Sequence, residues 1–534
     1  MDHNEIVEAR SGASPRDKKT EEELAPQVSR GGAVFGEVVG EITQADIEKQ
    51  KAAEGNAHFH RLGWKRLTVV LIVEAIALGS LGVPYAFATL GMVAGVITCV
   101  GLGFVAIYTS YIVGLTKLKY PQISHYADAG RLMFGRTGYE IVGAMFVLQL
   151  TFLVGSHCLT GTIAFGNLTD DGTCSLVFGV ASAIIMLILA IPPSFAEVAI
   201  LGYIDFVSIV AAIGITIIAT GVQRGEITTA AWSAWPKEGV TFAECFIAIN
   251  QIVFSYSFAV CQFSFMDEMH TPADFQKSIW ALGLIEIFIY TVTGALIYAF
   301  VGQEVRSPAL LSAGPLMAKV AFGVALPVIF ISGSINTTVV GRYLHGRMFR
   351  NSIKRYINTV GGWSSWLILI TVITIVAFLI AEAIPFFSEL LSISSSLFIS
   401  GFTFYFPALM WFMLLRDGKW TSKENLPHAL GNALAFIIGA IVLVCGTYAS
   451  IEEIVSISPP MSAISIANPS LENQVRDRRH QPSFHLPASG LSMYHHHTAS
   501  FSAFQFQATA MIYDFGVFRR GRRALDLLDC VFLL

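Results

Sequence analysis

Residues 71–85 read LIVEAIALGSLGVPY, and this stretch decides the fold. It is apolar enough to lie within a lipid bilayer, yet it combines a carboxylate, a cluster of small residues and a proline. The small residues Ala77–Gly82 and Pro84, which lacks a backbone donor, together favour a break or unwound turn at membrane depth. The alternative is an unbroken helix whose small residues allow close contact with a neighbouring helix.

Outward from this stretch, long apolar runs alternate with short polar loops. Of the 534 residues, 54% are hydrophobic and only 13% are charged, about half the usual charged share. So few charges cannot cover the surface of a soluble enzyme, and the net charge of −4 provides no basic field for nucleic acid. We therefore predict an all-α polytopic membrane protein that resides in the lipid bilayer and has no nucleic-acid partner.

Apolar runs of about 20 residues cross the hydrocarbon core as helices. Basic residues are concentrated in one set of the loops between these runs, with 13 on one side and three on the other. This bias places the N-terminus in the cytoplasm. Eleven transmembrane helices are predicted, at residues 67–90, 92–116, 140–165, 174–192, 199–222, 244–265, 279–301, 316–340, 363–385, 390–415 and 428–450.

The two ends of the chain differ from the transmembrane domain predicted at residues 62–455. Residues 1–61 are expected to form a disordered acidic cytoplasmic tail, because the first 60 residues contain 12 Asp and Glu but only 7 Lys and Arg. Residues 456–534 are rich in Ser, Pro, His and Gln and are interpreted as an atypical low-complexity extension. Its run His495–His497 fits that composition better than a metal site, so no metal and no cofactor are predicted.

Four ionisable residues within the predicted spans are candidates for a functional role. Glu74 lies in the first span, where a carboxylate is costly and by default indicates function, here the carrying of a proton. The alternative for Glu74 is a purely structural pairing. His157 in the third span suits a proton relay or plain packing. Glu286 lies mid-span in the seventh, and Asp205 lies near the inner end of the fifth, where a solvated role fits equally well.

The sixth predicted span contains the stretch NQIVFSYSFA at residues 250–259. It mixes hydroxyls with aromatic rings in the middle of a helix, which suits a small ligand with one polar and one apolar end. Ordinary packing with hydroxyl hydrogen bonds between helices is the alternative. The candidate binding residues of this stretch are Phe254, Ser255, Tyr256, Ser257 and Phe258.

Three separated motifs resemble those of one known family. The stretch Glu74–Gly95, EAIALGSLGVPYAFATLGMVAG, resembles the first-helix signature of the amino acid/auxin permease family, and in particular of its fungal neutral amino acid permeases. Tyr108–Tyr111 also fits, as do Asp267–Met269 and Thr271–Phe275 after the sixth span. The resemblance extends over residues 65–455.

This resemblance implies a LeuT-like fold, in which two inverted five-helix repeats are followed by an eleventh helix. Helices one and six would be broken around the substrate, with Phe254 to Phe258 at the second break. Backbone groups of Ala77, Leu78, Gly79 and Ser80 would hold the amino acid carboxylate. This chain departs from the family at Ala77, where the pattern has glycine, and at Val83, where it has leucine, which leaves substrate choice open.

The resemblance further implies secondary import of amino acids, with neutral or aromatic side chains favoured. A position that some relatives use for sodium aligns near Val73, beside Glu74, which favours a proton as the coupling ion. In this interpretation protonation of Glu74 favours closure around the amino acid, and the plasma membrane is the expected location.

Three alternatives differ from that interpretation. One is a vacuolar exporter of the same family, and another is an amino acid sensor without transport. An intramembrane enzyme would need a convergent catalytic set, and Glu74 with His157 does not make one. Walker A, HExxH and GxSxG motifs are absent from the sequence, so we predict no enzymatic activity.

Overall fold

A computed structural model describes residues 63–457, apart from residues 194, 224–230, 268, 350–351, 353, 355–356 and 358. The tail predicted at 1–61 and residues 458–534 of the extension predicted at 456–534 therefore lie outside the described residues. Within the described part of the chain, the regular elements are helices, and no strand occurs among them. The predicted all-α class is confirmed.

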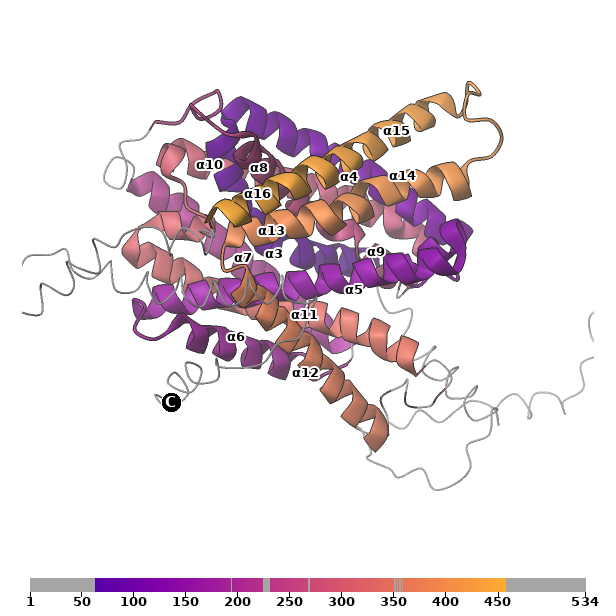
Figure 1. Cartoon of the computed structure of the whole chain (residues 1–534), viewed down its shortest axis with the longest axis horizontal. Helices are drawn as coiled ribbons and strands as arrows, with labels where there is room; N and C mark the ends of the chain where they lie inside the picture. The colour runs from indigo at the N-terminus through magenta and orange to yellow at the C-terminus, as the bar shows by residue number, and fades with distance from the viewer. Residues whose placement is uncertain are drawn as a thin grey trace, which may run out of the picture.

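The main helices follow the order of the predicted spans (Figure 1). Helix six is interrupted, and the last two spans each join several helical segments. In chain order the helices are α3 (Trp64–Leu90), α4 (Met92–Lys119), α5 (Tyr126–Thr169), α6 (Ser175–Leu189), α7 (Phe195–Val222), α8 (Phe242–Ser255), η1 (Ser257–Ala259), α9 (Gln262–Asp267), η2 (Pro272–Asp274), α10 (Phe275–Val301), η3 (Gly302–Glu304), η4 (Ala309–Ala313), α11 (Pro315–Met348), α12 (Val360–Ala383), α13 (Phe387–Ser394), η6 (Ser395–Tyr405), α14 (Phe406–Met410), η7 (Trp411–Leu415), α15 (Leu426–Ile441), η8 (Val442–Gly446) and α16 (Thr447–Ile457).

Eight helical segments among the described residues are long and apolar enough to cross a membrane. A ninth is added when the two bent parts of α3 are counted as one span. The helices α6 and α8 are apolar but shorter. The class of polytopic helical membrane protein is thus confirmed, whereas the count of eleven stays a prediction.

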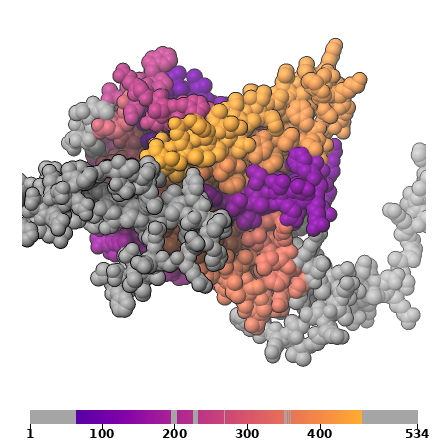
Figure 2. Space-filling view, in the orientation of Figure 1, coloured from indigo at the N-terminus to yellow at the C-terminus, as the bar shows by residue number. Residues whose placement is uncertain are grey.

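Large apolar side chains on the outer helices explain how the bundle meets lipid. Ile368 of α12 is 65% exposed, Leu430 of α15 is 64% exposed and Val444 of η8 is 68% exposed. The segments from α13 to α14 and from α15 to α16 pack side by side (Figure 1), and α15 and α16 form part of the surface seen in Figure 2. Such a continuous apolar exterior suits acyl chains and would be unfavourable in water.

Helix α3 provides the interior around which the other helices pack. It contacts α10, α8, α7 and α11. The described side chains from Leu71 to Pro84 are all buried. The segment that the sequence marks as exceptional is therefore enclosed by protein rather than exposed to lipid.

Two local features set the boundaries of helix six. Its first half begins at a capping box, in which Thr241 Oγ1 accepts from the Glu244 N–H at 3.1 Å and Glu244 Oε2 accepts from the Thr241 N–H at 2.8 Å. The helix ends at Ser255, and Tyr256 has φ −98° and ψ 39°. The one-turn η1 and the short α9 follow. The predicted break at Phe254 to Phe258 is confirmed.

Candidate functional site

Helix α3 is bent but not unwound. It stays helical through Pro84 and bends by 44° between Val73 and Ala75, before the small-residue cluster. Of the two possibilities left open for Ala77–Gly82, the close helix contact is the one observed, and the break or unwound turn is not. The physical reason is the position of the small residues, which serve a close contact with α8.

Two glycines of α3 make that contact possible. A Cβ on Gly79 would lie 2.8 Å from Ser255 Cα, and a Cβ on Gly82 would lie 2.1 Å from Gln251 Oε1. Both distances are shorter than real Cβ contacts allow. Only glycine fits at position 79, where the near atom is backbone, whereas a larger residue at position 82 would have to displace the Gln251 side chain; such small-residue helix contacts are typical within membranes.

The contact joins the two stretches that the sequence singles out. The Ser255 hydroxyl donates to the Gly79 carbonyl at 3.0 Å and lies at the same distance from the Gln251 carbonyl. The structure thus brings the predicted residues of helix one and helix six to one buried surface beside the break. All nine are buried, namely Ala77, Leu78, Gly79, Ser80, Phe254, Ser255, Tyr256, Ser257 and Phe258.

Side chains from neighbouring helices stabilise the break by capping its carbonyls. The Tyr290 hydroxyl of α10 donates to the Ser255 carbonyl at 3.0 Å, and Thr403 Oγ1 of η6 donates to the Tyr256 carbonyl at 3.2 Å. The Tyr256 hydroxyl in turn donates to the Cys99 carbonyl of α4 at 2.9 Å. Backbone groups freed inside a membrane need such partners, and the sequence analysis did not identify these.

A second polar cluster lies at the bend of α3. Asp205 of α7 has no exposed surface, and its Oδ2 accepts from the Ser332 hydroxyl of α11 at 2.8 Å. The same hydroxyl lies 3.5 Å from the Val73 carbonyl. A solvated role for Asp205 at a helix end is therefore wrong, and this buried cluster was missed by sequence reasoning.

The two predicted proton-coupling residues occupy different positions. Glu74 lies within the bend of α3, and its side chain is outside the described residues. His157 of α5 is fully buried and packs against α11, where a Cβ on Gly333 would lie 3.0 Å from His157 Cβ. Because Gly333 follows Ser332, His157 and Asp205 reach α11 at adjacent residues.

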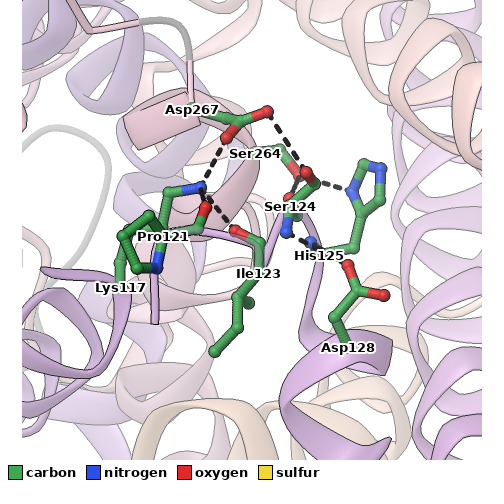
Figure 3. A network of polar contacts seen from close by, with 8 residues as sticks. All are labelled: Lys117, Pro121, Ile123, Ser124, His125, Asp128, Ser264 and Asp267. Carbon is green, nitrogen blue, oxygen red and sulfur yellow. Dashed lines mark hydrogen bonds and ion pairs between the residues drawn. The ribbon is translucent and has the colours of Figure 1, made fainter. Parts of the chain in front are cut away.

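A third cluster ties the far end of α9 to the loop between α4 and α5 (Figure 3). Lys117 of α4 is 5% exposed and pairs with Asp267 at the end of α9. The Lys117 ammonium also donates to the carbonyls of Pro121 and Ile123. A buried cation with three acceptors is well satisfied, so this end of helix six is firmly attached.

The same loop provides two further links to α9 (Figure 3). Ser124 Oγ donates to Asp267 Oδ2 at 3.2 Å, and His125 Nδ1 lies 2.8 Å from Ser264 Oγ. Asp128 Oδ2 accepts from the backbone N–H groups of Ser124 and His125 at 3.0 and 3.1 Å. Burial lowers the pKa of His125 from 6.5 to about 4, so it is neutral here at physiological pH.

Metal binding finds no support in the described part of the chain. Among those residues no group of three or more His, Cys, Asp or Glu side chains is arranged to hold a metal ion. The cluster at the bend of α3 consists instead of one acid with a hydroxyl and a carbonyl, which suits hydrogen bonding and proton binding.

Comparisons with known proteins identify the family. Residues 60–452 match the family model described as "transmembrane amino acid transporter protein". The chain is 65% identical over 433 residues to the N amino acid transport system protein of Neurospora crassa, covering 79% of this chain and 92% of that protein. The chain belongs to the transmembrane amino acid transporter protein family. The family resemblance at the first and sixth helices is thereby confirmed.

A more distant relative is also a transporter, and one solved structure shares the fold. A transmembrane transporter of Fusarium pseudograminearum is 28% identical over 427 residues, covering 77% of this chain and 88% of that protein. The crystal structure of MhsT in complex with L-phenylalanine superposes with a TM-score of 0.51 at 14% identity, over 73% of this chain and 99% of that chain. The latter shows the LeuT-like fold. The protein is thus a multi-pass membrane amino acid transporter and not an enzyme.

Proposed function

We propose that this transporter imports neutral or aromatic amino acids together with a proton across the plasma membrane. The observation that carries the proposal is the buried contact between the Gly79 region of α3 and the break of helix six at Ser255. It places backbone groups and aromatic rings together inside the bundle. The 65% identity to an N amino acid transport system protein supports the same interpretation.

The amino acid is proposed to bind beside the break. The backbone of Ala77–Ser80 would contact its carboxylate, and Phe254 and Phe258 would bound its side chain. Both rings are buried beside the break, and apolar walls with a few polar groups are typical of sites for such ligands. Ser257 is the proposed hydroxyl contact, since it lies in η1 between the two halves of helix six.

Proton coupling is proposed to act at the bend of α3. Glu74 lies within that bend, and His157 packs against α11 nearby, so both stay candidates for carrying the proton. With the N-terminus in the cytoplasm, the loop between α4 and α5 lies on the inner side. The Lys117–Asp267 pair then holds α9 closed on that side, and its separation would accompany release of the amino acid.

The test is uptake of a panel of labelled amino acids by cells that lack their own permeases, at pH 5 and at pH 7.5. We expect uptake of neutral or aromatic amino acids that rises at low pH and collapses with a protonophore. Glu74→Gln, measured beside wild type, should lose the pH response. Surface-localised protein without uptake of any amino acid would contradict import and favour a vacuolar exporter or a sensor.

A further inference from the structure

We propose that Asp205 binds a proton during the transport cycle and that Ser332 transmits its protonation state to the bend of α3. This inference rests on the proposed proton symport and adds to it a site on α7 and α11. Asp205 and Ser332 are not part of the substrate-binding residues at the break. Their position instead links three helices at the point where α3 changes direction.

Packing fixes these three helices against one another at the cluster. Asp205 lies on α7, Ser332 on α11 and Val73 on α3, and each of the three residues is buried. The Ser332 hydroxyl reaches both Asp205 Oδ2 and the Val73 carbonyl. One turn before Asp205, a Cβ on Gly202 would lie 3.8 Å from Val73 Cγ2, so α7 also touches α3 directly.

The hydrogen bonding of Asp205 favours a proton on the carboxyl group. Among the described residues its Oδ1 is buried and has no hydrogen-bond partner, whereas Oδ2 has Ser332. An ionised carboxylate with one hydroxyl donor inside a membrane is costly, because burial of a charge needs several compensating partners. A proton removes the charge and gives Asp205 a donor of its own.

The cluster has two hydrogen-bonded arrangements that differ by one proton. When Asp205 is ionised, the Ser332 hydroxyl donates to Oδ2, and the Val73 carbonyl lacks that donor. When Asp205 is protonated, its O–H donates to Ser332 Oγ, and the Ser332 hydroxyl is free to donate to the Val73 carbonyl. The Ser332 Oγ–Asp205 Oδ2 distance of 2.8 Å suits donation in either direction, and the Val73 carbonyl at 3.5 Å lies within reach of the Ser332 hydroxyl. Proton binding therefore strengthens the link between α11 and α3.

Other titratable groups sit further from this cluster or serve another one, apart from Glu74 beside Val73 and His157 of α5, which contacts Gly333 next to Ser332. Along α11, Lys319 and Arg342 lie about 20 Å and about 15 Å from Ser332. Glu286 lies one turn from Tyr290, whose hydroxyl contacts the break of helix six. The titratable and charged residues on the elements packed against α7 are Lys65, Arg66, Glu74 and Tyr85 on α3, Lys277, Glu286, Tyr290 and Tyr298 on α10, and Lys319, Arg342, Tyr343, His345 and Arg347 on α11.

Glu74 is therefore the neighbouring acid that an experiment must separate from Asp205. It adjoins Val73 in the chain, and its own protonation would change the same bend. Asp205→Asn addresses Asp205 alone, because an amide can donate to Ser332 Oγ as a protonated carboxyl does but cannot release a proton. Ser332→Ala keeps both acids and removes only the hydroxyl that connects Asp205 to α3.

The experiment measures uptake at pH 5 and pH 7.5, accumulation against a gradient, and exchange of internal for external amino acid, each normalised to surface protein. We expect Asp205→Asn to keep exchange, to lose uphill accumulation and to bring the uptake ratio between the two pH values to unity. Ser332→Ala should weaken the pH response in the same direction. Ser334→Ala is the matched control, because the Ser334 hydroxyl donates to the Ile331 carbonyl of its own helix, and it should behave as wild type.

Each outcome decides between the two proposals. Wild-type uptake that ignores both pH and protonophore would overturn proton symport itself. A pH-dependent wild type with unchanged pH response and accumulation in Ser332→Ala and Asp205→Asn would overturn the role of Asp205 alone. Were Asp205→Asn to stay off the cell surface, Ser332→Ala would decide, since a wild-type pH ratio in that variant contradicts the link through Ser332.

Discussion

Helix one and helix six form the two sides of the same buried contact, yet only one of them breaks. Helix α3 continues through Pro84 with a single bend of 44° near Val73. Helix six stops at Ser255 and resumes at Gln262 after the one-turn η1. Both segments are buried by protein on all sides, so exposure to lipid does not explain the difference.

The hydrogen-bond partners of the two helices explain why helix six is interrupted and α3 is not. The carbonyls at the break of helix six receive donors from Tyr290 and Thr403 on neighbouring helices. In α3 the polar side chains serve the helix itself, since Ser80 Oγ donates to the Ile76 carbonyl at 2.8 Å and Thr89 Oγ1 to the Tyr85 carbonyl at 3.1 Å. Neighbouring donors satisfy the carbonyls freed at the break of helix six, whereas α3 stays helical even where Ser255 donates to its Gly79 carbonyl, so small residues alone do not break it.

The largest loss of stability is expected when a bulky side chain is placed on the α3 side of its contact with α8. Gly79→Leu would place a side chain against Ser255 Cα, and backbone cannot move away as a flexible side chain can. We expect a loss of stability of about 3 kcal/mol or more, and loss of folded protein in size-exclusion profiles. Gly101→Leu is the control, because a Cβ at Gly101 meets nothing within 4 Å. Equal yields of the two variants would contradict the close contact.

Detaching the far end of helix six should cause the next largest loss of stability. Lys117→Met removes a cation that is 5% exposed and leaves Asp267, which is 31% exposed, without it. We expect about 3 kcal/mol lower stability, at the low end for a broken buried pair because Asp267 is partly solvated. Lys277→Met is the matched control, since that lysine is 60% exposed beside Asp274 and such pairs contribute about 0–1 kcal/mol. Thermal unfolding in detergent measures both, and similar shifts would contradict the attachment of α9 through Lys117 and Asp267.

His125 should make the attachment of α9 sensitive to pH. Its pKa is about 4 in the folded protein and 6.5 ordinarily, so the unfolded chain binds the proton first. Stability is therefore full above pH 6.5 and falls as the pH drops toward 4, by about 2 kcal/mol between pH 7 and pH 5. His125→Gln should remove this part of the pH dependence, measured by thermal unfolding at both pH values. The exposed His270→Gln should leave it intact, and the opposite pattern would contradict burial of His125.

The smallest effect concerns the start of helix six. Thr241→Ala removes the cap of α8, because its Oγ1 accepts from the Glu244 N–H, and should lower stability by about 1 kcal/mol. Thr371→Ala is the control, since that hydroxyl donates within α12 to the Leu367 carbonyl. Thermal unfolding of both proteins distinguishes a cap from an ordinary hydroxyl. No difference between them would show that the capping box is dispensable.

The sequence predicts those features that are marked by local composition. Small residues in the first span and the mixture of hydroxyls and rings at residues 250–259 correctly identify two stretches that meet. The same small residues left a break and a close helix contact both open, because composition does not reveal which neighbour they contact. That neighbour is Ser255, which contacts Gly79 and lies 176 residues away from it along the chain.

Features that depend on distant partners were not predictable from the sequence. Asp205 was placed near a helix end, and its burial follows from packing against Ser332, 127 residues later. Lys117 and Asp267 are 150 residues apart. Charge and hydropathy along the chain locate such residues in or near the membrane, but only tertiary packing pairs them.

The most direct test of the account is protection of a cysteine placed at the break. Ser257→Cys should react with a small thiol reagent slowly, and a transported neutral amino acid should slow the reaction further in a concentration-dependent manner, above the background of the wild-type cysteines. Ser456→Cys near the end of α16, which is exposed, should react independently of substrate. Unchanged labelling of Ser257→Cys at a saturating concentration of an amino acid that the variant still transports would contradict binding at the break of helix six.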